Sequence, residues 1–224
     1  MAVASDACPV ELVEGLSRSV TEKILADSRL KCFVAGQDIF RAGEAKEAIY
    51  VLLDGLAKVS QVDCNGNETI LWLTSPGQVI GSLNFAADCT QSSSALAVQA
   101  CKVVMWNLVR FESILERYPV VLRNTERILA RQMAELSCRI CEISTAPTWL
   151  CMGKALIRLT EGLGRRVNGH VEVELTQETL ARLIGTTVYN VNRLLLHWEL
   201  EGLVQRRRRA IVVRDLPGLK KLCA

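Results

Sequence analysis

Residues Leu175–Leu203 read LTQETLARLIGTTVYNVNRLLLHWELEGL, and this stretch decides how the rest of the chain is interpreted. It contains two short segments with apolar residues at helical spacing, separated by Gly185, which permits a left-handed turn of the backbone. Thr176 and Thr187 stand just before the two segments, and threonine is favoured as the N-cap of a helix. The stretch therefore predicts two helices joined by a short turn.

The second predicted helix has two unlike faces. One face is an apolar stripe that would pack against its own domain, formed by Val191, Leu194, Leu195 and Trp198. The opposite face would point outward, and it carries Val188, Tyr189, Asn192, Arg193 and Leu196. A short helix, a turn with glycine and a second helix with outward polar groups form the helix-turn-helix pattern, which places the second helix in the DNA major groove.

Individual side chains in this pattern can be given roles. Arg193 can donate two hydrogen bonds to guanine, and Asn192 could read adenine or touch phosphate. Tyr189 either faces the groove or packs on its own helix. Predicted phosphate contacts at the helix N-termini are Thr176, Gln177 and Thr187.

A basic hairpin follows the two helices. Leu203–Val204 and Ala210–Val213 are short apolar runs, and QRRRR lies between them. The arginines of this tip, which cannot be buried unpaired, are Arg206, Arg207, Arg208 and Arg209. The hairpin predicts a wing that contacts phosphate, with affinity that falls as salt rises. The alternative is a solvated charge run without a partner.

Charge is unevenly distributed along the 224 residues. The net charge is +3, but residues 147–224 hold 13 Lys or Arg against 7 Asp or Glu, whereas residues 1–146 hold 14 against 17. This asymmetry indicates a nucleic-acid module attached to a domain with another task. The sequence lacks both a basic leader before an apolar core and an apolar run of membrane-spanning length, so we expect a cytoplasmic protein without a membrane partner.

Short β-rich runs alternate with turn residues from Lys31 to about Leu108, after a helix-like segment at residues 9–30. Asp54–Gly55 and Asn65–Gly66 have residue types favoured in hairpin turns. About eight strands at this spacing predict a rolled antiparallel sheet.

A long helix is predicted from Phe111 to Ser144, where Pro119 could mark a kink or a boundary. Apolar residues recur every seven positions along it: Leu115, Leu122, Leu129, Leu136 and Ile143. This repeat predicts the seam of a two-fold coiled coil, the alternative being a helix packed only within its own chain. Ala146–Pro147 then predicts a hinge, followed by a helix over Trp149–Gly162 and a loop over Gly164–Gly169.

The predicted fold class is α+β in three parts. Residues 1–110 would form a sensory β-roll with an N-terminal helix, residues 111–146 a dimerisation helix and hinge, and residues 147–224 a winged helix-turn-helix.

In this order, the parts resemble the CRP/FNR family of bacterial transcription regulators. The resemblance covers about Leu30 to Leu219 and is carried, besides the helix-turn-helix, by GQDIFRAGE (36–44), IYVLLDGLAKV (49–59), PGQVIG (76–81) and SALAV (94–98). It implies a cyclic-nucleotide-binding-like sensory roll, a homodimer, a palindromic DNA operator, contact with RNA polymerase if the protein activates, and an allosteric switch. Arg193 matches the family's arginine, whereas Tyr189 replaces a glutamate, so we expect a different half-site.

The implied effector pocket departs from the members that bind cyclic AMP. Those members carry a glutamate after the glycine of PGxxIG and an Arg-Ser pair further on, but here Ser82 and Gln91–Ser94 occupy these places, and neither segment holds a cation. Cyclic AMP bound in the usual way is therefore disfavoured, because a buried phosphate needs a partner. The cofactor stays unknown, with haem or a small organic effector as candidates, and the pocket residues would be Gly81, Ser82, Leu83, Asn84, Ser92 and Ser93.

Nine scattered cysteines fit a reducing compartment with mostly free thiols, and they motivate an alternative function as a thiol- or metal-based redox protein. Members with an iron–sulfur cluster hold it by closely spaced N-terminal cysteines, whereas Cys8 and Cys32 are far apart. His170, predicted in a loop, and His197 have no matching ligand cluster. We therefore predict no metal site and, without an acid/base pair, nucleophile elbow or phosphate loop, no enzyme.

Overall fold

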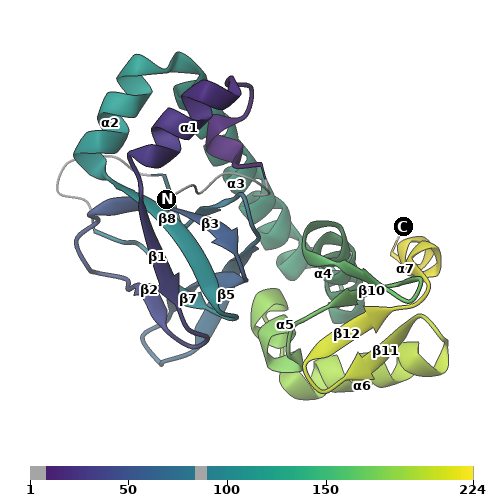
Figure 1. The fold of residues 1–224 in the computed structure, drawn as a ribbon. Helices are drawn as coiled ribbons and strands as arrows, with labels where there is room; N and C mark the ends of the chain where they lie inside the picture. The colour runs from purple at the N-terminus through teal and green to yellow at the C-terminus, as the bar shows by residue number, and fades with distance from the viewer. Residues whose placement is uncertain (1–8, 84–89, 224) are drawn as a thin grey trace. The chain divides into compact units, whose positions relative to one another are not determined.

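A computed structural model describes residues 9–83 and 90–223 of the chain (Figure 1). The chain divides into two compact units, the first formed by Met1–Asn67 with Leu71–Glu135 and the second by Glu68–Ile70 with Leu136–Ala224. Helix α3 (Pro119–Thr145) begins in the first unit and ends in the second.

Two four-stranded sheets form the roll, with strand orders β1-β8-β3-β6 and β2-β7-β4-β5, and all their residues belong to the first unit except Glu68–Ile70 of β5. The strands are β1 (Arg29–Phe33), β2 (Asp38–Phe40), β3 (Ala48–Asp54), β4 (Ala57–Val62), β5 (Glu68–Thr74), β6 (Val79–Ile80), β7 (Ser94–Ala97) and β8 (Cys101–Asn107). Strand pairs β1–β8, β3–β8 and β4–β7 are antiparallel. The predicted antiparallel β-roll with eight strands is confirmed within the described residues.

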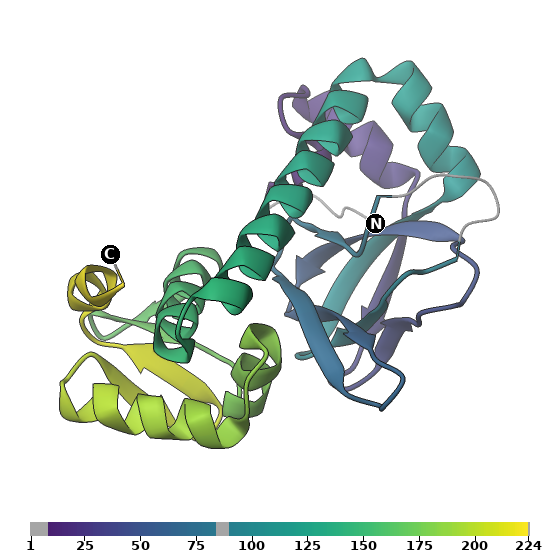
Figure 2. The same cartoon turned by 180° about the vertical axis from the view of Figure 1, so that it is seen from behind.

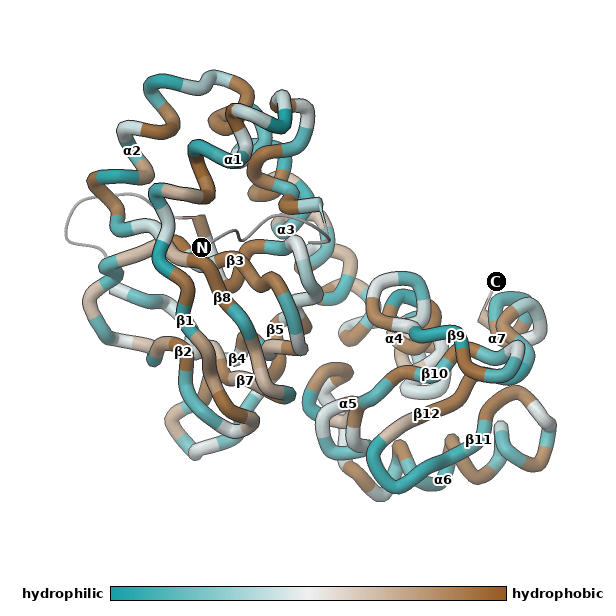
Figure 3. The backbone as a smooth tube through the Cα atoms, in the orientation of Figure 1, coloured by the Kyte–Doolittle hydropathy of each residue, from teal (hydrophilic) through white to brown (hydrophobic). Residues whose placement is uncertain are grey.

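The sheet that contains β3 and β8 is buried on both faces. Side chains alternate between the faces of a strand, so Val51 and Val104 join one apolar cluster, and Leu52 and Val103 join the other. All four are completely buried. In Figure 3, hydrophobic segments lie along both strands. One cluster fills the space between the two sheets, and the other is covered by helices.

The covering helices of the first unit are a 3-10 turn η1 (Glu11–Val13), α1 (Arg18–Ala26), α2 (Leu108–Arg117) and the first part of α3. The predicted N-terminal helix is therefore shorter than residues 9–30, because β1 already begins at Arg29. Trp106 on β8 ties α1 to the sheet, since its indole N–H donates to the Ile24 carbonyl at 2.9 Å.

The long helix predicted over residues 111–144 is divided into two helices, and of the two options at Pro119, a kink or a boundary, the boundary is the one observed. Helix α2 ends before Tyr118, whose φ of −126° and ψ of 86° are not helical, and Pro119 begins α3. Proline is tolerated at a helix start because the missing N–H would have no partner there. Leu115 consequently lies on α2, where it packs against the core of the roll instead of continuing the repeat on α3.

The second unit consists of α4 (Thr148–Leu163), β9 (Arg165–Val167), β10 (His170–Val173), α5 (Gln177–Ile184), α6 (Val188–Leu200), β11 (Val204–Arg207), β12 (Ala210–Val213) and α7 (Leu216–Leu222). Its sheet has the strand order β11-β12-β10-β9. The predicted loop over residues 164–169 contains strand β9, and His170 belongs to β10 instead of a loop. The predicted wing is confirmed as the β11–β12 hairpin, whose register pairs Arg207 with Ala210.

These elements confirm the predicted α+β class, with antiparallel sheets in the N-terminal part, a long central helix and a C-terminal helix-turn-helix. No helix in the described part of the chain is long and apolar enough to cross a membrane.

Candidate nucleic-acid interface

The helix-turn-helix is formed by α5 and α6, and both helices are capped as the sequence predicts. The Thr176 hydroxyl accepts a hydrogen bond from the Thr179 backbone N–H at 3.1 Å, and the Thr187 hydroxyl accepts one from Asn190 N–H at 3.2 Å. Gly185 ends α5 with a φ of 69°, the left-handed conformation that favours glycine. The Thr176 hydroxyl also lies 2.9 Å from the Thr179 hydroxyl, and either of the two oxygens could be the donor.

The apolar stripe of α6 packs into its own unit. Val191, Leu195 and Trp198 are at most 2% exposed, and Leu194 is half-buried. Trp198 lies close to α4, where a Cβ at Gly153 would stand 3.5 Å from its ring. A Cβ at Gly153 would also lie 2.1 Å from Sγ of Cys223, so the glycine makes room for the end of α7. The buried stripe fixes which face of α6 is left uncovered.

The uncovered face of α6 carries the predicted outward residues. Tyr189 is 75% exposed, Val188 and Leu196 are close to half exposed, and Arg193 is exposed. Arg193 forms no ion pair with any residue of the described ranges, so its guanidinium is available to a partner. This face therefore combines the apolar Val188 and Leu196 with the polar Tyr189 and Arg193.

Asn192 differs from its neighbours because it is half-buried and already bonded. Its side-chain Nδ2 donates to Oε1 of Gln177 at 3.1 Å. Gln177 is the first residue of α5, so the bond joins the two helices of the motif. Two residues that the sequence predicts as separate DNA contacts are thus in contact with each other.

The four arginines of the wing have unlike surroundings. Arg206 donates to Glu199 through both its backbone N–H and its side-chain Nε, each at 2.8 Å. Arg207 pairs with Glu172 at 2.7 Å. Arg208 and Arg209 form the turn between β11 and β12, are exposed, and make no ion pair within the described residues. The tip therefore offers two uncommitted cations.

Glu199 lies where α6 approaches the wing. The Arg206 backbone N–H, followed by the Arg206 side chain, lowers the pKa of Glu199 below its ordinary value because both donate hydrogen bonds to the carboxylate. Arg206 thus holds β11 against the end of α6. Sequence reasoning groups it with the other arginines, since nothing in a run of four shows which one finds a carboxylate.

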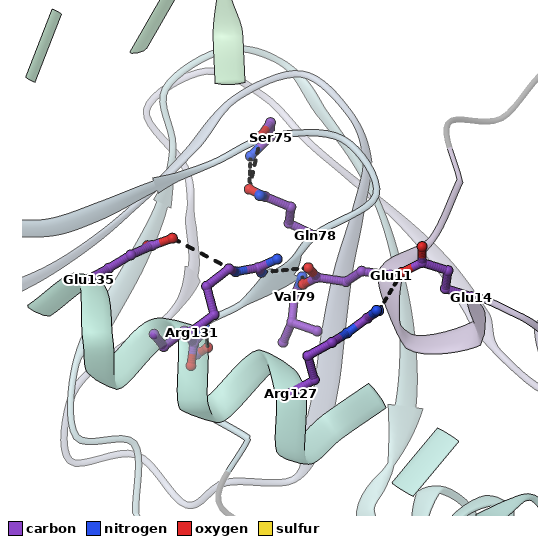
Figure 4. A network of polar contacts seen from close by, with 10 residues as sticks. Glu11, Glu14, Ser75, Gln78, Val79, Arg127, Arg131 and Glu135 are labelled. Carbon is purple, nitrogen blue, oxygen red and sulfur yellow. Dashed lines mark hydrogen bonds and ion pairs between the residues drawn. The ribbon is translucent and has the colours of Figure 1, made fainter. Parts of the chain in front are cut away.

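Helix α3 has one face occupied and one uncovered. Along its first part, Val121, Asn124, Thr125 and Ile128 are buried against the roll. The Asn124 amide donates to the carbonyls of Leu12 and Glu14 at 3.0 and 2.9 Å. Figure 4 shows Arg127 paired with Glu14, and Arg131 paired with Glu11 at 2.6 Å and with Glu135 at 3.8 Å. In the same view, Glu11 also accepts the Val79 backbone N–H.

The other face of α3, the long helix in Figure 2, carries exposed apolar residues. Met133 is 71% exposed, Ile140 67%, Ile143 48% and Leu122 42%, whereas Leu129 and Leu136 are half-buried. Successive members are three, four or seven positions apart, the spacing of a coiled-coil seam. Four of the five predicted seam residues thus lie on α3, and Leu115 does not.

Five of the six predicted effector residues lie in the described part of the roll. Gly81, Leu83 and Ser93 are buried, Ser82 is half-buried and Ser92 is exposed; Asn84 lies outside the described residues. The Gln132 side chain from α3 donates to the Gly81 carbonyl at 3.2 Å.

Lys46 lies beside Ser82, and the sequence does not identify it as a residue of the effector region. It is only 7% exposed and its ammonium donates to the Ser82 carbonyl. Neither Ser82 nor the segment Gln91–Ser94 supplies a cation, as the sequence shows, but the fold brings Lys46 to Ser82 from the loop before β3. No local motif marks Lys46, because the contact joins residues 36 positions apart.

A surface pocket of about 420 Å³ lies elsewhere in the first unit, between α1 and α2. Lys23, Asp27, Arg110 and Arg117 stand around it, over Ile24 and Ile114. None of the predicted effector residues that the structure describes lines this pocket.

The cysteines provide no assembled redox or metal site in the described residues. Seven are free thiols, with Cys138 and Cys141 exposed on α3. No group of three or more His, Cys, Asp or Glu in the described ranges could hold a metal ion. His170 has a buried Nδ1 without a hydrogen-bond partner in these ranges, and His197 lies 3.3 Å from Glu201.

Two family models match the chain. The cyclic nucleotide-binding domain matches residues 30–118, and the Crp-like helix-turn-helix domain matches residues 152–222. The first range covers the roll and α2, and the second covers most of α4 and everything up to the end of α7.

Similar proteins include two from Thermus thermophilus. The transcriptional regulator SdrP is 29% identical over 85% of this chain and 92% of its own, and the cyclic AMP receptor protein is 24% identical over 94% and 95%. The crystal structure of a CRP/FNR-family transcriptional regulator from the same organism has a TM-score of 0.74, with 25% identity over 87% of this chain and 98% of its own.

Proposed function

The chain belongs to the CRP/FNR family of transcription regulators, and from this premise we propose that it binds a two-fold-symmetric DNA operator as a homodimer. Regulators of this family bind DNA as dimers and contact RNA polymerase. The observation that carries the proposal is the uncovered face of α6, where an uncommitted Arg193 stands beside exposed Tyr189 on a helix fixed by its buried stripe.

Each part of the second unit has a role in this proposal. Helix α6 enters the major groove, with Arg193 donating to guanine O6 and N7. Thr176, Gln177 and Thr187 face the phosphates at the N-termini of α5 and α6. Arg208 and Arg209 of the wing supply counterion-releasing contacts, whereas Arg206 and Arg207 first have to leave their carboxylates.

Dimerisation places two copies of α6 on one duplex. The apolar stripe of α3 supports a parallel pairing with the same helix of a second copy, since an exposed row of Leu122, Met133, Ile140 and Ile143 lowers its free energy by leaving water. Paired helix-turn-helix units read half-sites about one helical turn apart.

The signal is proposed to bind in the roll, near Gly81, Ser82, Leu83 and Ser93. A cyclic nucleotide held by a glutamate and an Arg-Ser pair is disfavoured, because Ser82 and Gln91–Ser94 stand at those places. Haem and small organic molecules are the candidate classes. A signal can shift the protein between two states only if it binds the DNA-competent state better.

The proposed cell location is the cytoplasm, where the DNA partner lies, and the proposed role is regulatory without catalysis. RNA polymerase is the further partner if the protein activates transcription. No observation in the described residues favours the redox alternative.

Selection from random-sequence duplex DNA tests the proposal. The purified full chain should enrich a palindromic sequence with half-sites about one helical turn apart, and affinity should fall as salt rises. Failure to enrich any duplex at low salt would overturn it. Native mass spectrometry and an absorption spectrum of the same preparation should show whether haem or an organic molecule occupies the roll, and calorimetric titration with cyclic AMP should give no heat of binding.

A further inference from the structure

Gln177 and Asn192 form a bond between the two helices that meet the duplex in the proposed function. Gln177 is the first residue of α5, and Asn192 stands directly before Arg193 on α6. The bond runs from Asn192 Nδ2 to Gln177 Oε1 at 3.1 Å, and both side chains are half-buried. The Asn192 amide is therefore held in one orientation before DNA binds.

The bond leaves each amide with a defined remaining capacity. Asn192 uses one of its two Nδ2 hydrogens, so the second hydrogen and Oδ1 stay available. One donor and one acceptor side by side match adenine, which accepts at N7 and donates from N6. Gln177 uses Oε1, so its Nε2 donors can reach a phosphate oxygen.

We propose that Gln177 is the positioning residue for base reading by Asn192, and that the pair specifies adenine. The proposal rests on the proposed function, because it assumes that the outward face of α6 lies in the major groove. An amide that is already fixed loses less freedom on binding than one that rotates in solvent. Gln177 thus couples a sequence-independent phosphate contact to a base-specific one.

The test uses the full chain and the duplex that the wild type selects. Asn192→Ala first identifies the base pair that Asn192 reads, as the position whose preference disappears. Duplexes substituted only at that pair are then compared by fluorescence anisotropy for the wild type, Gln177→Ala, Gln177→Glu, Asn192→Ala and the Gln177→Ala/Asn192→Ala double variant. Circular dichroism melting confirms that each variant is folded.

The expected wild-type preference for adenine is about tenfold or more. Gln177→Ala should lose most of it, and the double variant should be no less selective than Asn192→Ala alone, because the two residues act as a unit. Gln177→Glu should keep the preference, since a carboxylate oxygen also accepts from Nδ2, yet it should bind every duplex more weakly because of its charge near phosphate.

Arg193→Ala serves as the matched control, because it should change the preference at a different base pair and leave the adenine preference in place. If Gln177→Ala weakens all duplexes equally and keeps the adenine preference, Gln177 is only a phosphate contact and the assignment is overturned. A preference for another base at the Asn192 position also overturns it. If the wild type enriches no duplex, the proposed function itself has failed.

Discussion

Helices α3 and α6 each bury one face and leave the other uncovered, but the uncovered faces differ in chemistry. On α3 it is an apolar row that includes Met133 and Ile140, each about two-thirds exposed or more. On α6 it is mixed, with Tyr189 and Arg193 between smaller apolar side chains. The buried face of each helix packs within the chain. The chemistry of the uncovered face indicates what kind of partner would cover it.

An apolar face is stabilised by any apolar surface of matching shape, and a second copy of the same helix supplies one automatically. A polar face needs donors and acceptors at defined places, which base edges and phosphates supply. The difference between the two faces supports the proposal that α3 sets the number of copies and that α6 sets the sequence that those copies read.

The largest expected effect comes from placing charge in the α3 stripe. Ile140→Asp should convert the dimer to monomer at micromolar concentration, because each change removes an apolar side chain worth about 1.5–3 kcal/mol and occurs twice in a symmetric dimer. Sedimentation velocity measures the change. Cys138→Asp is the matched control, since Cys138 is exposed on the same helix but lies outside the stripe, and it should remain dimeric. A dimeric Ile140→Asp protein would show that the stripe is not the seam.

The next effect concerns Arg193. Arg193→Ala should weaken binding to the selected operator by about 1–3 kcal/mol while leaving affinity for random duplex nearly unchanged, because a bidentate contact to guanine carries sequence information. Anisotropy titrations on both duplexes measure it. His197→Ala, also exposed on α6, is the control and should have a smaller effect on the operator. An equal loss of affinity for the operator and for random duplex would mean that Arg193 contacts phosphate and not a base.

The α6 face could be predicted from sequence because helical spacing, caps and glycine are local signals. Residues 188–200 contain both the stripe that is buried and the face that is left, so their periodicity suffices. Strand positions in the roll follow from local alternation in the same way. The sequence alone could not decide whether Pro119 kinks one long helix or begins a second helix, because proline is compatible with both.

What the sequence could not show are the contacts between distant residues. Lys46 reaches Ser82, and Arg207 reaches Glu172 across 35 positions. In the sequence, Gln177 and Asn192 each look like a separate DNA contact, but in the structure their side chains are hydrogen-bonded to each other. A count of charges treats the four arginines of the wing alike, whereas in the structure Arg206 and Arg207 are paired with carboxylates and Arg208 and Arg209 form no ion pair within the described residues. Such pairings depend on strand order and helix packing, which no local pattern records.

The wing sharpens the comparison, because its arginines separate into committed and uncommitted ones. Arg208→Ala/Arg209→Ala should weaken operator and random duplex alike, and the slope of log affinity against log salt should fall by about one for each phosphate that is no longer neutralised. Titrations at several salt concentrations measure it. The control is Arg207→Ala, whose side chain is paired with Glu172 in the free protein, so it should change the slope by clearly less than half as much as the double variant does. A change in slope for Arg207→Ala equal to half that of the double variant would contradict the division.

The smallest expected effect lies at the junction of α6 and the wing, where Glu199 holds Arg206. Hydrogen bonds from Arg206 lower the pKa of Glu199 below its ordinary value of 4.5. A carboxyl whose folded pKa is lowered stabilises the fold fully above its unfolded pKa, and this contribution is lost as the pH falls through the lower folded value. The pair is partly exposed, with side chains 26% and 32% accessible, so solvent screening limits its contribution to about 1 kcal/mol or less.

Glu199→Gln isolates this contribution, because the amide oxygen can still accept from the Arg206 N–H but carries no charge. Urea unfolding should show the variant less stable than the wild type near neutral pH, and the difference should shrink as the pH falls below 4.5. Glu201→Gln, on a carboxylate 45% exposed beside His197, is the control and should cost less at neutral pH. A difference that stays constant on acidification would mean that Glu199 acts through packing, and that the wing is held to α6 without its charge.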